Sequence, residues 1–104
     1  MSLIETPEIE KCLIVSTGHI SKLDSEKLTD MASGGFQPLI VMDKDQYGWW
    51  ICVPGKDDED VFERASCMSE AFVTLLKEAT FHECKWLVLD WCGPQYPNLP
   101  IFEW

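Results

Sequence analysis

Residues 85–104 read Lys85-Trp86-Leu87-Val88-Leu89-Asp90-Trp91-Cys92-Gly93-Pro94-Gln95-Tyr96-Pro97-Asn98-Leu99-Pro100-Ile101-Phe102-Glu103-Trp104. The apolar run over residues 86–91 predicts a buried strand, and Gly93-Pro94 ends it. Two more prolines then lead to an aromatic end, where a polar tail is usual. Since proline permits only edge or non-strand positions, this pattern predicts a short edge strand or docked tail over residues 101–104.

Working outward, apolar periodicity and turn residues predict four strands and two helices. The predicted strands are 11–17, 39–42, 49–54 and 86–91, and the predicted helices are 22–33 and 66–82. With the terminal segment, this is a β-α-β-β-α-β order plus a short fifth strand. It predicts an α+β, ferredoxin-like fold, with a mostly antiparallel sheet and two helices on one face. We expect residues 1–104 to form a single domain, in which 1–10 are a loosely held arm.

Local signals support these elements. Ser21 and Asp24 have the spacing of a capping box at the start of the first helix. The unbroken apolar run 12–15 predicts a central strand covered on both faces. Residues 101–104 should dock so that Phe102 and Trp104 are buried near His19 or Asp90.

The composition excludes several classes of function. The chain carries 8 Lys and Arg against 18 Asp and Glu, a net charge of −10, which argues against direct nucleic-acid binding. A partner is expected to be basic or apolar. No apolar run approaches the roughly 18 residues of a membrane span, and the start lacks a secretion signal, so we expect a cytoplasmic protein.

Five cysteines are present, and we expect them to be reduced and to behave mostly as small buried apolar residues. Their spacing contains no paired ligand motif of the Cys-x-x-Cys kind. The sequence therefore predicts no metal site and no cofactor.

Two residues are candidates for catalysis. His19 follows the first strand and could act as a general base, although a lone loop histidine is more often structural. Asp90 interrupts an apolar strand, either for function or because it caps the Gly93-Pro94 turn. The acidic loop 57–60 could imitate phosphates for a basic partner, but such loops are usually only solvated.

Aromatic residues are the candidate binding residues. On strand 49–54 the two-residue period places Trp49 and Trp50 on opposite faces. If both helices cover one face of the sheet, aromatic residues on the other face need a cover, which predicts a homodimer or a bound ligand. The candidate binding residues are Trp49, Trp50, Trp86, Trp91 and Trp104.

Three motifs together resemble a known family. They are Ser16-Thr17-Gly18-His19-Ile20-Ser21, Tyr47-Gly48-Trp49-Trp50 with Val53-Pro54, and Trp86-Leu87-x-Leu89-Asp90-x-x-Gly93-Pro94 with Leu99-Pro100-x-Phe102-Glu103-Trp104. The chain resembles a small domain family of unknown function encoded on plasmids, prophage-like islands and other mobile DNA. The resemblance implies an accessory gene of a mobile element and carries over no catalytic residue.

These observations favour a non-enzymatic module for protein interaction or small-ligand binding. One alternative is a small enzyme that uses His19 and Asp90 as acid and base. Another is an acidic mimic that inhibits a nucleic-acid-binding host or phage-defence protein. The first alternative requires both side chains to meet in one pocket, whereas the second requires acids spread over one surface.

Overall fold

A computed structural model describes residues 3–34, 39–44, 47–54, 63 and 65–104. Its strands and longer helices are β1 (Cys12–Ser16), α1 (Lys22–Ala32), β2 (Val41–Asp43), β3 (Gly48–Cys52), α3 (Glu70–Phe81) and β4 (Trp86–Asp90). Two short 3-10 helices, η1 (Thr17–His19) and η2 (Ala65–Cys67), come before α1 and α3. The predicted α+β class is confirmed, and the strands and longer helices of the described residues follow one another as β-α-β-β-α-β.

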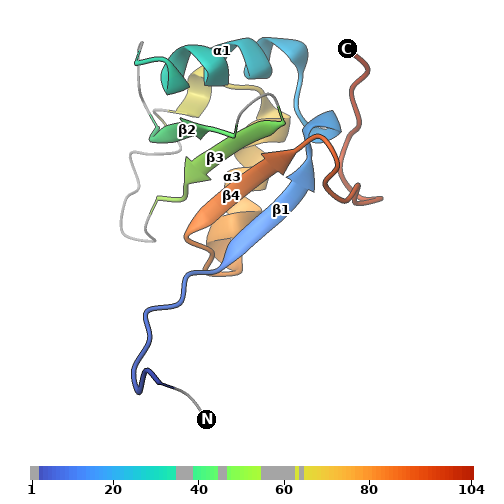
Figure 1. Ribbon diagram of the computed structural model, residues 1–104. Helices are drawn as coiled ribbons and strands as arrows, with labels where there is room; N and C mark the ends of the chain where they lie inside the picture. The colour runs from blue at the N-terminus through green and yellow to red at the C-terminus, as the bar shows by residue number, and fades with distance from the viewer. Residues whose placement is uncertain (1–2, 35–38, 45–46, 55–62, 64) are drawn as a thin grey trace.

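The strands form one sheet in the order β1-β4-β3-β2 (Figure 1). β1 runs parallel to β4, whereas the β4–β3 and β3–β2 pairs are antiparallel. β1 therefore lies at an edge of the sheet, and β4 lies between β1 and β3. The ferredoxin-like arrangement is not confirmed, and neither is a fifth strand, because residues 101–104 pair with no strand in the described chain.

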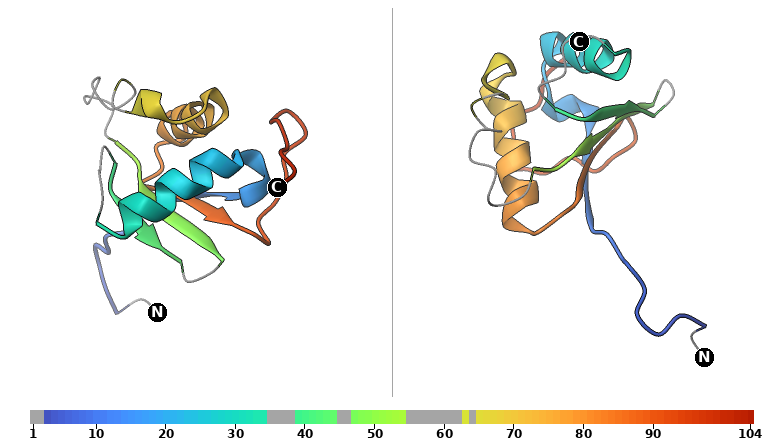
Figure 2. Two further views of the ribbon diagram at one scale, coloured as in Figure 1. Left: turned by 90° about the horizontal axis from the view of Figure 1, so that it is seen from above. Right: turned by 90° about the vertical axis from the view of Figure 1, so that its left-hand side faces the viewer.

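Both helices cover the same side of the sheet, as the right-hand view of Figure 2 shows. We call this side the core face and the opposite side the open face. Side chains from alternate strand positions meet the helices on the core face. The buried cluster includes Val15, Val41, Ile51, Leu87 and Leu89 of the strands and Leu28, Met31, Phe72, Leu75, Leu76 and Ala79 of the helices.

Capping side chains fix where the helices begin. The Ser21 hydroxyl accepts a hydrogen bond from the Asp24 N–H, and the Asp24 carboxylate accepts one from the Ser21 N–H, so the predicted capping box is confirmed. Ser69 caps α3 by accepting from the Phe72 N–H. The predicted helix 66–82 is therefore too long at its start, because this cap separates η2 from α3.

Strand β1 is not the covered central strand that its apolar run predicts. Cys12 is exposed and Ile14 is 45% exposed, whereas Leu13 and Val15 face the core. β4 is one of the two inner strands, and its Leu87, Val88 and Leu89 are all buried. The apolar runs over residues 12–15 and 86–91 thus both predict a strand correctly, but only the second run belongs to an inner strand of the sheet.

Candidate functional site

The His19 side chain is fully buried at the end of β1, where it holds the C-terminal segment. Its Nδ1 lies 2.8 Å from the Pro100 carbonyl oxygen, and its Nε2 accepts a hydrogen bond of 2.9 Å from the Tyr96 N–H. Because an amide N–H only donates, Nε2 is the acceptor and Nδ1 carries the proton. His19 is therefore neutral in this arrangement, and neither nitrogen is available to a substrate.

The chain end continues along the same segment. The Phe102 N–H donates to the Gly18 carbonyl at 2.7 Å, and the Trp104 indole N–H donates to the Ile20 carbonyl at 2.9 Å. The predicted docking near His19 is thus observed, although its burial is only partial, because Trp104 remains 54% exposed and Phe102 is half-buried. One backbone hydrogen bond and one side-chain hydrogen bond thus hold this tail against residues 18–20, outside the sheet.

Asp90 ends β4 on the open face. Its carboxylate pairs with the Lys44 ammonium at 2.5 Å and accepts a hydrogen bond of 2.9 Å from the Cys92 N–H. Lys44, and then the Cys92 amide, hold the pKa of the Asp90 carboxyl below its ordinary value. Asp90 thereby closes the turn that precedes Gly93.

We expect Asp90→Asn to lower the melting temperature at pH 7, because it removes the pairing with Lys44. The pKa of the Asp90 carboxyl is lower in the folded chain than its ordinary value of 3.8, so the carboxylate stabilises the fold at every pH above 3.8. This stabilisation is lost as the pH falls through the lower pKa of the folded chain. The difference between variant and wild type should therefore disappear well below pH 3.8. Melting curves at pH 7 and under acid conditions test this, with Asp30→Asn on the exposed surface of α1 as control. A difference that stays constant with pH would contradict it.

His19 and Asp90 share one end of the sheet but do not form an acid and base pair. Ser16 and Asp90 are register partners on the neighbouring strands β1 and β4. The C-terminal segment encloses the His19 ring, whereas the Asp90 carboxylate pairs with Lys44 on the open face. Each polar group of the proposed pair is already bound by a structural partner.

The five tryptophans do not gather in one site. Trp49 packs partly against the core, and Trp104 lies beside Ile20. Trp91 is 62% exposed and stacks on Tyr47 with ring centres 5.9 Å apart. Trp50 and Trp86 meet edge to face on the open face, at 6.2 Å. Only these last two belong to a common surface.

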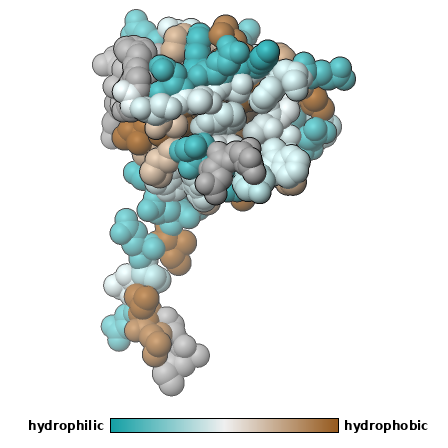
Figure 3. Space-filling view, turned by 45° about the horizontal axis from the view of Figure 1, so that its top comes forward, coloured by the Kyte–Doolittle hydropathy of each residue, from teal (hydrophilic) through white to brown (hydrophobic). Residues whose placement is uncertain are grey.

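The open face has an apolar centre. The register pairs Trp50 with both Met42 and Val88, and Val88 with Ile14, so these four side chains cross the sheet in one row. Val88 is buried although neither α1 nor α3 lies on this face, and the register places Ile14 and Trp50 on either side of it and Trp86 two positions before it. By contrast, the face seen in Figure 3 is largely hydrophilic over α1, and its apolar residues lie in separate small areas.

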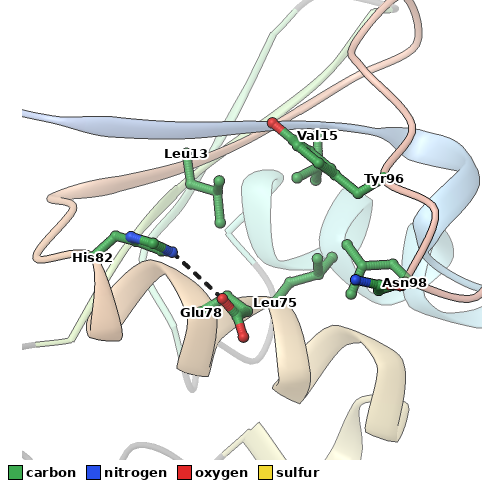
Figure 4. Close-up of a pocket in the computed structure, with 8 residues that line it drawn as sticks. Leu13, Val15, Leu75, Glu78, His82, Tyr96 and Asn98 are labelled. Carbon is green, nitrogen blue, oxygen red and sulfur yellow. Dashed lines mark ion pairs between the residues drawn. The ribbon is translucent and has the colours of Figure 1, made fainter.

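A second concave feature, which we call the β1–α3 groove, lies between the edge strand and the helix (Figure 4). It contains a cavity of about 250 Å³. Its lining residues are Leu13, Val15, Leu75, Glu78, His82, Tyr96, Asn98 and Leu99. The sequence did not predict this groove, because it exists only where β1 is an edge strand. The one hint of this groove in the sequence is the pair Glu78 and His82, which lie four residues apart on the predicted second helix.

The cysteines offer no metal site among the described residues, where no cluster of three or more ligand side chains is found. None of the five forms a disulfide. Their expected burial is wrong: Cys12, Cys67 and Cys92 are exposed, and Cys52 and Cys84 are half-buried. In the described chain, no helix has the length and apolar character needed to cross a bilayer.

The fold and its surfaces define a small α+β domain with a four-stranded mixed sheet, helices on one face and an aromatic open face. A family model for the C-terminal domain of DUF5983, a family of unknown function, matches residues 12–104. The chain belongs to this family. No curated protein and no solved structure matches the chain.

Proposed function

We propose that this domain is a non-enzymatic interaction module that works as a homodimer, formed by the open face of one copy against the open face of another. The observation that carries the proposal is the row Ile14, Val88, Trp50 and Met42, with Trp86 beside it, on a sheet face that no helix of the described residues covers. Exposed apolar surface of this kind is typical of a contact surface. A two-fold axis through it would pair the same patch from both copies.

The charge distribution favours a second copy as the occupant. Two chains that each carry −10 repel one another over most of their surface. On the open face, however, Lys44 and Asp90 neutralise each other, and Glu10 accepts a hydrogen bond from the Trp86 indole. The side chains of the apolar row are themselves uncharged, so two copies can bring these rows together without placing acidic side chains of the row against one another.

The enzymatic alternative receives no such support, because His19 and Asp90 are both engaged by structural partners. The acidic loop 57–60, on which the mimic alternative depends, lies outside the described residues. The biological setting that we propose is an accessory gene carried on mobile DNA. It rests on the motif resemblance, and membership of a family of unknown function is consistent with it.

We expect light scattering at micromolar concentration to give twice the 11.9 kDa chain mass. Trp50→Glu should raise the dimer dissociation constant about a thousandfold or more, since burying one large apolar side chain contributes roughly 2 to 3 kcal/mol and the symmetry counts it twice. Met42→Glu, at an exposed position of the same row, should act in the same direction.

The matched control is Phe81→Glu, because Phe81 is 78% exposed at the end of α3, on the helix side of the sheet. It adds the same charge and should leave the dimer intact. Far-UV circular dichroism confirms that each variant is folded. A wild-type chain that is monomeric at micromolar concentration contradicts the proposal, and so does a dimer that survives both open-face changes.

A further inference from the structure

The outer edge of β1 carries backbone groups that pair with no other strand of the described residues. The Trp86 N–H donates to the Lys11 carbonyl, so alternation directs the groups of Leu13 and Val15 toward β4 and those of Cys12 and Ile14 outward. Further along, the Ile14 carbonyl accepts from the Tyr96 hydroxyl and the Ser16 N–H donates to the Pro94 carbonyl. In the described chain, this leaves the N–H and C=O of Cys12 and the N–H of Ile14 unpaired. Unpaired strand edges of this kind are templates for a further strand.

The cavity of the β1–α3 groove lies directly beside this edge. Leu13 and Val15 of β1 and Leu75 of α3 provide its apolar lining, and the Tyr96 ring and Asn98 close the end nearest the C-terminal segment (Figure 4). Its volume of about 250 Å³ is enough for one large side chain, since an apolar cavity of about 150 Å³ already accepts a benzene molecule.

The rim of the groove favours a positive charge. Glu78 lies on the α3 side with about half of its side chain exposed, and its carboxylate is 3.6 Å from His82 Nε2. The chain as a whole carries a charge of −10, which adds to this preference. A bound segment should therefore place a lysine or arginine near Glu78, two positions from the residue in the cavity, because alternate residues of a strand share a face.

We propose that the β1–α3 groove binds an extended peptide segment of a partner protein. The segment adds as a short strand to the Cys12–Ile14 edge, inserts one aliphatic or aromatic side chain between β1 and α3, and places a basic residue beside Glu78. Backbone hydrogen bonds supply the affinity and the cavity supplies the specificity, as in other cases of strand addition. This site is separate from the open face, and the proposal does not depend on whether the domain dimerises.

The probe is a capped pentapeptide, acetyl-Lys-Thr-Leu-Thr-Lys-amide, titrated to millimolar concentration into the ¹⁵N-labelled chain. Its leucine fits the cavity, and lysines on both sides of it serve either strand direction. We expect saturable shifts of the Cys12 and Ile14 amide signals in two-dimensional NMR spectra. A matched peptide with glutamate in place of both lysines should bind roughly twofold to fivefold more weakly, the usual range for an exposed ion pair.

The charge reversal Glu78→Lys is the decisive control, because Glu78 is exposed and its replacement leaves the core intact. This variant should invert the preference, so that the glutamate peptide binds more tightly than the lysine peptide. A leucine peptide with an N-methylated backbone should lose binding to both proteins. The proposal is overturned if the Cys12 and Ile14 signals do not move at millimolar peptide, if the shifts lie on the open face, or if Glu78→Lys leaves the preference unchanged.

Discussion

Replacing His19 with alanine is expected to lower the free energy of unfolding by about 3 to 4 kcal/mol. The ring is fully buried, and both nitrogens bind backbone groups of the C-terminal segment. Alanine would leave a cavity, an unpaired Tyr96 N–H and an unpaired Pro100 carbonyl. Urea unfolding, followed by tryptophan fluorescence, measures the change through the midpoint at constant slope.

His82→Ala is the matched control, because this second histidine is more than half exposed and its loss should change the stability by less than about 0.5 kcal/mol. Deletion of residues 101–104 should lower the stability by about 2 kcal/mol, since it removes the half-buried Phe102 and the Trp104 indole bond to Ile20.

If His19 acts by holding this tail, the double change should cost less than the sum of the two single changes. Strict additivity would show that His19 and the tail stabilise the fold independently. It would also remove the physical basis for treating His19 as the holder of the chain end.

Replacing Asp24 with alanine is expected to lower the free energy of unfolding by about 3 kcal/mol or more. This buried carboxylate accepts from the Ser21 N–H at the start of α1 and from both the N–H and the hydroxyl of Ser69 at the start of α3. It therefore satisfies donors at both helix N-termini, where a negative charge is also favourable. No other change of one carboxylate in the described chain would remove caps from two helices.

Thermal and urea unfolding measure this effect, with Asp30→Ala on the exposed side of α1 as the control that should change the stability by less than about 0.5 kcal/mol. Hydrogen exchange provides a sharper readout. Amides in the first turns of both α1 and α3 should lose protection in Asp24→Ala. Lost protection in α1 alone would contradict the role of Asp24 as a cap shared by the two helices.

The sequence predicted the contact between Asp24 and Ser21, but not the contact between Asp24 and Ser69. The spacing of Ser21 and Asp24 identified the capping box, because it depends on backbone geometry over only four residues. The contact from Asp24 to Ser69 spans 45 residues and has no periodic signal. In the same way, His19 was singled out as a possible base. Its partners Tyr96 and Pro100 lie about 80 residues away, so the sequence could not reveal that both ring nitrogens are occupied.

The sequence by itself determined the order of the described elements, the start of α1 at Ser21, and the alternation of side chains along β3 and β4. These features depend on short-range periodicity and capping. Only the tertiary structure decided which apolar strand is central. The runs 12–15 and 86–89 look equivalent as sequence, yet β4 pairs on both sides, whereas β1 pairs on one. Strand order follows from which packing buries the most apolar surface, a property of long-range contacts between β1, β4 and α3. That order leaves the β1 edge open and so creates the groove beside it.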